Sequence, residues 1–210
     1  VNYLLIDVGN TETKLFFYKK TLIKKILIKS NLISEKTLKN KLRFIFKKKN
    51  KVNKIILSSV VPNLTKKIKK FFINKNNIKV NEIKDFNLKK YIKIKLNKKY
   101  VGSDRIANAI GVDRYKNYIV IDFGTATTFD VIIKNQYYGG IISPGIQLSL
   151  ETLFTKASLI NPIKLKKIKI IVGKNTKEAV RSGFFWGYIG LINNIIKLIH
   201  KKKRKKFDII

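Results

Sequence analysis

The sequence predicts an α/β protein built from two related halves within its 210 residues. Segments with strand and helix periodicity alternate along the chain. The motif Asp-x-Gly-x-x-x-Thr occurs twice, beginning at Asp7 and at Asp122, an offset of 122 − 7 = 115 residues. A repeat of this period is too long for a solenoid, and no Gly/Ser-rich or Pro-rich linker separates the copies. These observations indicate two α/β domains.

The first half carries strand and helix signals in the order β-β-β-α-β-α. Strands are expected at residues 3–8, 14–18, 22–29 and 54–61, with weaker signals at 78–83 and 91–96. A helix is expected from Ser34, its N-cap, to Lys48, and a second amphipathic helix follows Pro62. This order is typical of a ribonuclease-H-like unit, so we assign residues 1–101 to an N-terminal ribonuclease-H-like domain.

The second half repeats the pattern. A helix is expected over 103–114, strands over 118–122, 127–134 and 137–142, and a long helix over 176–201. We assign residues 102–210 to a second ribonuclease-H-like domain, which gives a fold of two mixed sheets flanked by helices. The long helix should pack its apolar side as core or as a dimer surface, through Phe184, Phe185, Trp186, Tyr188, Ile189, Leu191 and Ile192.

Composition excludes several classes of protein. The chain has no Cys, which removes disulfides and Cys-ligated zinc, and its single His leaves almost no material for a Ser-His-Asp triad. No run approaches the ~18 apolar residues of a membrane helix, and the N-terminus lacks the pattern of a secretory signal, so we expect a cytoplasmic protein. The net charge of +35 would suggest nucleic acid. However, the Lys residues are spread through every segment, as A/T-rich codons would produce, so nucleic acid is not the expected partner.

The first copy of the repeat, Asp7-Val8-Gly9-Asn10-Thr11, has the features of a phosphate-binding turn. Gly9 can take the positive φ of a tight turn, Asn10, Thr11 and Thr13 add donors, and Asp7 could hold a hydrated Mg²⁺. An ordinary hairpin is the alternative. The second copy at Asp122 favours phosphoryl transfer, because two such turns can grip a polyphosphate. The Gly173-Lys174 pair does not complete a P-loop.

The third element is Gly102-Ser103-Asp104-Arg105, which begins a predicted helix. Ser103 is expected to cap the helix, and Asp104 lies in the first turn, where the helix dipole favours a carboxylate. Asp104 could then accept the proton of an attacking hydroxyl, and Arg105 could grip a substrate carboxylate. The alternative is a plain helix cap with a first-turn acid.

These motifs, in this order, resemble those of type III pantothenate kinases. The resemblance is carried by the two Asp-x-Gly motifs, Gly102–Asn108, Gly139–Gly145, Val172–Thr176 and Arg181–Gly183, and it spans nearly the whole chain. It implies the actin-like ATPase fold and the transfer of the ATP γ-phosphoryl group to pantothenate. This reaction gives 4'-phosphopantothenate, the first step of coenzyme A biosynthesis. The family also implies a homodimer, Mg²⁺ and a monovalent cation, K⁺ or NH₄⁺.

The resemblance implies roles for individual residues. The ATP phosphates would contact Asp7, Val8, Gly9, Asn10, Thr11, Glu12, Thr13, Lys14 and Thr125. Pantothenate would contact Gly102, Ser103, Asp104, Arg105 and Thr176, with Asp104 as the proton acceptor. Asp122 would bind the monovalent cation, and the segment with Glu151, Leu153 and Phe154 would help to build the dimer and the substrate pocket.

The chain also departs from the family pattern. A Tyr that touches substrate is replaced by Lys95, and a following Pro by Lys98. The chain stops at Ile210, before the Thr-Gly-Gly segment that lies near the adenosine, so we expect a C-terminal domain truncated at its end. A catalytically weak or inactive homologue, acting as a basic nucleic-acid-binding or regulatory protein, therefore stays open as an alternative.

Overall fold

The computed structural model describes residues 1–47, 50–76 and 78–210, which form two compact units, Val1–Val112 and Asp113–Ile210. Each unit is described by itself. The predicted domain boundary at 101/102 falls within the first unit, before helix α3, and stays a prediction. The last residue of the helix expected over Ser34–Lys48 lies outside the described residues.

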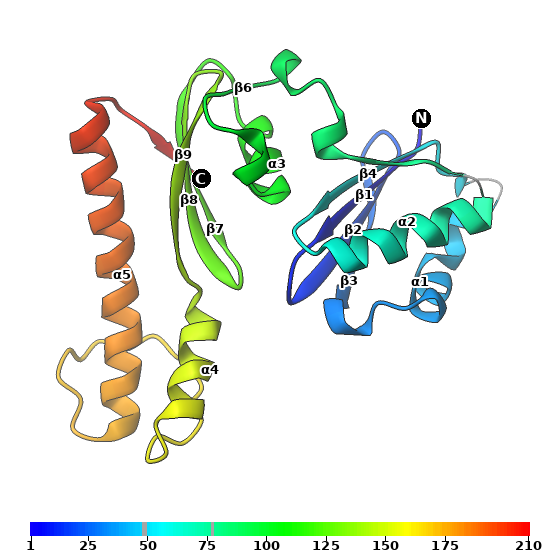
Figure 1. The fold of residues 1–210 in the computed structure, drawn as a ribbon. Coiled ribbons are helices and arrows are strands. Elements are labelled where there is room, and N and C mark those ends of the chain that lie inside the picture. Colours follow the sequence, from blue (N-terminus) through cyan, green and yellow to red (C-terminus); the bar gives the residue numbers. More distant parts are fainter. Residues whose placement is uncertain (48–49, 77) are drawn as a thin grey trace. The chain divides into compact units, whose positions relative to one another are not determined.

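The first unit contains a five-stranded mixed sheet in the order β3-β2-β1-β4-β5 (Figure 1). The strands are β1 (Tyr3–Val8), β2 (Glu12–Tyr18), β3 (Leu22–Lys29), β4 (Lys54–Ser59) and β5 (Val80–Glu82). β1, β2 and β3 pair antiparallel, whereas β4 pairs parallel with both β1 and β5. This is the ribonuclease-H-like order that the sequence predicts.

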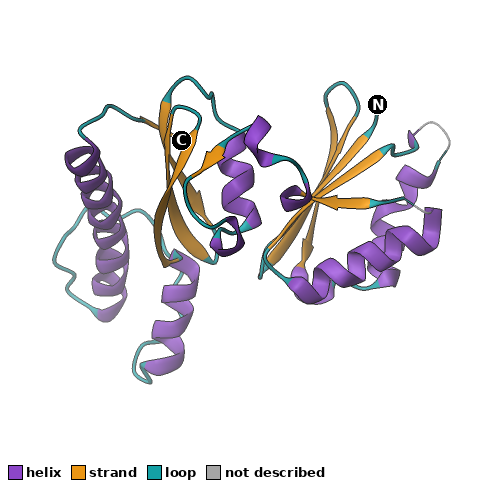
Figure 2. Cartoon of the chain, turned by 45° about the horizontal axis from the view of Figure 1, so that its top comes forward, coloured by secondary structure: helices purple, strands orange, loops and turns teal. Residues whose placement is uncertain are grey.

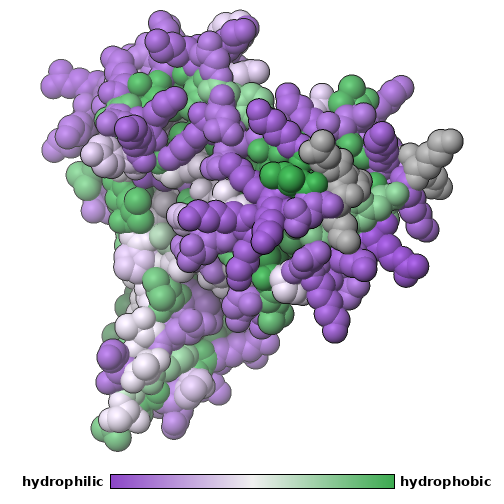
Figure 3. All heavy atoms as spheres, turned by 45° about the vertical axis from the view of Figure 1, so that its right-hand side comes forward, coloured by the Kyte–Doolittle hydropathy of each residue, from purple (hydrophilic) through white to green (hydrophobic). Residues whose placement is uncertain are grey.

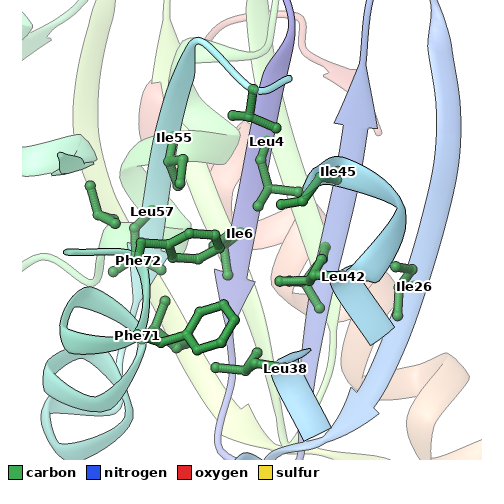
Figure 4. Packing of buried hydrophobic residues seen from close by; sticks show 14 of the residues in the cluster. Leu4, Ile6, Ile26, Leu38, Leu42, Ile45, Ile55, Leu57, Phe71 and Phe72 are labelled. Atoms are coloured by element: carbon green, nitrogen blue, oxygen red, sulfur yellow. The ribbon is translucent and has the colours of Figure 1, made fainter. Parts of the chain in front are cut away.

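Helices α1 (Glu35–Leu42) and α2 (Pro62–Asn76) cover one face of this sheet. Figure 4 shows their apolar side chains packed on those of β1 and β4. Burial alternates along β1, so that every second side chain enters the core between sheet and helices. The buried residues labelled in Figure 4 are Leu4, Ile6, Ile26, Leu38, Leu42, Ile45, Ile55, Leu57, Phe71 and Phe72.

Helix α1 begins as predicted, because the Ser34 side chain accepts a hydrogen bond of 3.1 Å from the Thr37 backbone N–H. It ends at Leu42 and continues as a 3₁₀ helix over Arg43–Phe46, earlier than the periodicity predicts. Helix α3 (Ser103–Ile110) contacts β4. The remaining short elements of the first unit are 3₁₀ turns at Ser30–Leu32, Ile83–Asp85, Leu88–Lys90 and Lys98–Tyr100, and strand β6 (Lys93–Ile94).

The second unit repeats the strand arrangement of the first. Its strands β7 (Asn117–Phe123), β8 (Ala126–Ile133), β9 (Gln136–Pro144) and β10 (Asp208–Ile209) lie in the order β10-β7-β8-β9. β7, β8 and β9 form an antiparallel meander, and β10 pairs parallel with β7 (Figure 2). This matches β4-β1-β2-β3 strand for strand. The internal repeat found in the sequence is therefore a repeat of structure, and the predicted fold class is confirmed.

Two helices complete the second unit, α4 (Ile146–Lys156) and α5 (Thr176–Lys203). The C-terminal half of α5 packs on the sheet, with Ile199 buried beside Ile119 and Phe129. Figure 1 shows that α4 and the N-terminal half of α5 extend beyond the end of the sheet. The sequence does not predict α4, whereas α5 lies where its pattern places it.

The apolar side chains of α5 are packed on the core in one part of the helix and exposed in another. Leu191 and Ile192 pack on the core, as predicted, whereas Trp186 and Ile189 are 39% and 36% exposed.

No helix in the described part of the chain is long and apolar enough to cross a membrane. Hydrophilic side chains are spread over the face drawn in Figure 3, with hydrophobic ones showing between them.

Candidate functional site

The first Asp-x-Gly motif forms the turn between β1 and β2. The Gly9 N–H donates a 3.0 Å hydrogen bond to the Glu12 carbonyl oxygen. The positive φ predicted for Gly9 is wrong, because Gly139 is the only positive-φ glycine among the described residues. Glycine is favoured instead by close approach, since a Cβ at Gly9 would lie 3.0 Å from the Glu12 oxygen.

Ser30, which follows β3, stabilises this turn through hydrogen bonds. Its hydroxyl donates to the Gly9 carbonyl at 2.6 Å and lies 3.0 Å from the fully buried Thr13 hydroxyl, and its N–H donates to the Thr11 carbonyl. The Thr13 hydroxyl thus stabilises the turn, while Asn10 and Thr11 are exposed. Sequence reasoning missed Ser30, because a serine after a strand carries no motif of its own.

Asp7 lies at the end of β1, directly opposite Lys14 on β2. The Lys14 Nζ and the Asp7 Oδ2 are 3.9 Å apart, and both side chains are partly exposed. On the other side, Asp7 pairs with Ser58 of β4, whose buried hydroxyl has no hydrogen-bond partner among the described residues. An ammonium group and a carboxylate side by side suit a phosphate group carrying Mg²⁺, since Mg²⁺ is often held by one carboxylate and substrate phosphates.

The second motif forms the corresponding turn between β7 and β8. The Gly124 N–H donates to the Ala126 carbonyl at 3.0 Å, and the Gly145 N–H donates to the Thr125 carbonyl at 3.0 Å. The Thr125 side chain is exposed at the tip of the turn. Gly145 is required by the close approach of the two backbones, because a Cβ there would lie 2.6 Å from the Thr125 carbonyl oxygen.

The two turns differ in length by one residue. Asp7 pairs with Lys14, seven residues on (14 − 7 = 7), whereas Asp122 pairs with Thr128, six residues on (128 − 122 = 6). The residue facing the aspartate is therefore an ammonium in the first turn and a hydroxyl in the second. The Thr128 hydroxyl is buried without a hydrogen-bond partner among the described residues. The Asp122 carboxylate and the Thr128 hydroxyl offer oxygen atoms of the kind that bind a monovalent metal ion.

Asp104 is held at the start of α3. Its Oδ1 accepts a 2.8 Å hydrogen bond from the Arg105 N–H, and its side chain is half-buried. Gly102 is the N-cap, and Ser103 is the buried first residue of the helix, so the predicted cap at Ser103 is wrong. A Cβ at Gly102 would collide with the Asp104 carboxylate, which is why a glycine precedes this helix.

Asp104 and Asp7 belong to the same compact unit. Helix α3 contacts β4, and β4 pairs with β1 so that Ser58 lies beside Asp7. The predicted base and the first predicted phosphate-binding turn are thus connected through one strand. Asp122, Thr125 and Thr176 belong to the second unit.

Thr176 is the exposed first residue of α5. Asn175 caps this helix by accepting a 3.0 Å hydrogen bond from the Glu178 N–H. The segment before α5 is hydrogen-bonded to this helix, since the Trp186 Nε1–H donates to the Ile170 carbonyl at 3.1 Å.

Thr176 lines a cavity of about 410 Å³ together with Arg181 and Lys164. A second cavity of about 680 Å³ includes Glu151 and Phe154 among its lining residues.

Comparison with known proteins identifies the family. The sequence profile of the type III pantothenate kinase family matches residues 3–198. The chain belongs to this family. A type III pantothenate kinase of Pelagibacter ubique (strain HTCC1062) is 49% identical over 207 residues, which cover 97% of this chain and 84% of that protein. A pantothenate kinase of the same type from Persephonella marina is 48% identical over 120 residues, 55% of this chain and 47% of its own length.

Among solved structures, a Baf family transcriptional activator of Campylobacter jejuni shares the fold of this pantothenate kinase family member. Its TM-score is 0.53 at 24% identity, and the match covers 91% of this chain and 78% of that one. At this level of identity the likeness concerns the fold alone.

Proposed function

We propose that this chain transfers the γ-phosphoryl group of ATP to pantothenate, giving 4'-phosphopantothenate for coenzyme A biosynthesis. The observation that carries the proposal is the family match over nearly the whole chain, together with the retained Asp7, Asp104 and Asp122. Each of these three carboxylates lies at the end of a strand or the start of a helix, where a ligand can reach it.

In the proposed reaction, the Asp7–Lys14 turn and Thr125 hold the phosphates of ATP. The backbone amides of the turn and the Lys14 ammonium provide donors to phosphate oxygens, and Asp7 would hold Mg²⁺. When bound, Mg²⁺ neutralises charge on the β- and γ-phosphates. The hydrogen bonds from Ser30 keep the turn in place, which supports its use as a preformed site.

Asp104 is proposed to accept the proton of the pantothenate primary hydroxyl. A bond forms between that oxygen and the γ-phosphorus while the bond from the γ-phosphorus to the β–γ bridging oxygen breaks, and ADP leaves. The hydrogen bond from the Arg105 N–H orients the Asp104 carboxylate. Gly102, Ser103, Arg105 and Thr176 would hold pantothenate, with the Arg105 guanidinium suited to the substrate carboxylate.

Asp122 would bind a monovalent cation, K⁺ or NH₄⁺, with Thr128 beside it. A cation there would add positive charge next to the Thr125 turn, which favours the binding of anionic phosphates. The one-residue difference between the two turns supports separate tasks for them.

A nucleic-acid-binding or regulatory role is the weaker candidate. The three site carboxylates are intact, and the positive charge is distributed along the sequence rather than confined to one stripe. The family match favours the enzyme over this alternative.

We also propose that the protein acts as a homodimer through the exposed parts of α4 and α5. From Ser182 to Ile196 the sequence has no charged residue, although charged residues make up 28% of the chain. Leu148 of α4, Trp186 and Ile189 are exposed in this region, and the Tyr188 hydroxyl lies 2.8 Å from the Ser149 hydroxyl, joining the two helices. A charge-free exposed face in a lysine-rich protein suits a second copy of the same chain.

Replacing Asp104 with Asn should reduce kcat by at least about 10²-fold, because the amide cannot accept the proton. ATP binding, measured by calorimetry, and the circular dichroism spectrum should stay as in the wild type. Asp113→Asn, an exposed change of the same kind at the start of the second unit, is the matched control. Turnover of Asp104→Asn at the wild-type rate would refute the proposed mechanism.

Gly102→Ala should lower kcat by roughly tenfold or more, because the new methyl group displaces the Asp104 carboxylate from its hydrogen bond with the Arg105 N–H. Gly111→Ala, at the other end of α3, serves as the control, since its Cβ would meet neighbours at 3.4 Å or more. Steady-state kinetics and thermal unfolding are measured for both. Equal kcat values for the two variants would show that the position of Asp104 does not depend on Gly102.

Ile189→Lys should convert the proposed dimer into monomers, because a lysine would be buried unpaired at the interface. Light scattering coupled to size-exclusion chromatography measures the mass in solution. Ile73→Lys on α2, at a residue that is 55% exposed, is the control and should leave the mass unchanged. A wild-type protein that runs as a monomer at micromolar concentration would contradict the proposal.

A further inference from the structure

A buried serine beside the first turn has no hydrogen-bond partner. Ser58, near the end of β4, is 8% exposed, and its hydroxyl is buried without a hydrogen-bond partner among the described residues. A buried hydroxyl that makes no hydrogen bond costs free energy, so an alanine would serve better here if folding were the only task. A serine at this position therefore indicates that its hydroxyl gains a partner when a ligand binds nearby.

The next residue, Ser59, shows what a purely structural serine does in this strand. Its hydroxyl accepts a 3.1 Å hydrogen bond from the Val61 N–H and lies 3.3 Å from the Val61 carbonyl oxygen, to which it donates. Helix α2 begins at the following residue, Pro62. The hydroxyl of Ser59 is thus engaged in the free protein, whereas that of Ser58 is not.

The register of the sheet places Ser58 beside Asp7. The two residues pair directly in the parallel ladder of β4 and β1, so their side chains lie on the same face of the sheet. The residues before them, Ile6 and Leu57, point into the core on the opposite face (Figure 4). Neighbouring strands lie about 4.8 Å apart, so a change of the Ser58 χ1 rotamer can bring its hydroxyl within reach of the Asp7 carboxylate.

We propose that Ser58 is a positioning residue for Asp7, and that its hydroxyl donates a hydrogen bond to the Asp7 carboxylate when Mg²⁺ and the phosphates of ATP are bound there. Asp7 already has partners in this structure, Lys14 among them. A carboxylate has about four acceptor positions on its two oxygens, so the bond from Ser58 adds to these partners and replaces none. The inference rests on the proposed function, which assigns Mg²⁺ and the ATP phosphates to the Asp7 turn.

The size of the effect follows from how metal sites are built. Hydrogen bonds to a metal-binding carboxylate fix its orientation, and their loss typically weakens metal binding by about ten- to a hundredfold. Ser58 provides one neutral donor, so we expect the lower end of this range. The unliganded protein should lose no stability with this hydroxyl, because the hydroxyl makes no hydrogen bond there.

The test measures nucleotide binding and stability separately. Calorimetry gives the dissociation constant of a non-hydrolysable ATP analogue in excess Mg²⁺, and thermal unfolding without nucleotide or Mg²⁺ gives the stability of the whole protein. Ser58→Ala removes the hydroxyl that lacks a partner, and Ser59→Ala, the matched control, removes the one that has partners. Ser58→Cys keeps a side chain of similar shape and replaces the hydroxyl with a weaker donor.

We expect Ser58→Ala to raise the dissociation constant by about tenfold and to leave the unfolding temperature at or above that of the wild type. Ser59→Ala should lower the unfolding temperature and leave the dissociation constant within about twofold of the wild type.

A dissociation constant of Ser58→Ala within about twofold of the wild type would overturn the inference. So would an unfolding temperature lowered as far as in Ser59→Ala, since this would show that the Ser58 hydroxyl makes a structural hydrogen bond. If Ser58→Ala does not fold, Ser58→Cys decides, and an unchanged dissociation constant in that variant overturns the inference.

The same calorimetry separates this inference from the function on which it rests. If the wild type binds the analogue and Ser58→Ala binds it equally well, the inference fails alone and the kinase proposal stands. A wild-type protein that does not bind the analogue overturns both the nucleotide site at Asp7 and the role of Ser58.

Discussion

Antiparallel strand pairing is the constraint on which the rest of this structure depends. The pairing of β1 with β2 places Asp7 next to the turn of one hairpin, and the pairing of β7 with β8 places Asp122 next to the turn of the other. Each pairing also fixes the residue that faces the aspartate. In the first unit, the helices on one face of the sheet fill the core, and the alternation of β1 keeps Asp7 out of that core. In each unit the register of two strands thus fixes the position of one residue of the proposed site.

A difference of one residue in turn length places a different residue opposite the aspartate in each copy of the hairpin. The longer first turn puts the Lys14 ammonium opposite Asp7, which suits a phosphate and its divalent ion, while the shorter second turn puts the Thr128 hydroxyl opposite Asp122, which suits a monovalent cation. Two copies of one unit can therefore diverge in function without any change in the order of their strands.

Much of the fold could be predicted from periodicity. The strand and helix patterns, the repeat at Asp7 and Asp122, and the cap at Ser34 all depend on local sequence, and the structure confirms them. The short helix α4 was not predicted although Pro144 and Gly145 precede it, because its N-cap, Gly145, has no side chain that could mark the start of a helix.

The details of the turns depend on contacts that the sequence does not show. Gly9 was expected to need a positive φ, whereas the structure requires it for close backbone approach, and Ser103 proved to be a buried helix residue with Gly102 as the cap. Ser30 contacts the first turn from a position just after β3, two strands further along the chain. Such a contact depends on tertiary packing, and no local sequence pattern predicts it.

The central claim is that these carboxylates serve a phosphoryl transfer to pantothenate. The most direct measurement is the release of ADP from ATP by the purified protein, with and without pantothenate, at several potassium concentrations and constant ionic strength. The account predicts ADP release that requires pantothenate and rises with potassium until it saturates. ADP release that is absent, or that proceeds equally without pantothenate, would contradict it.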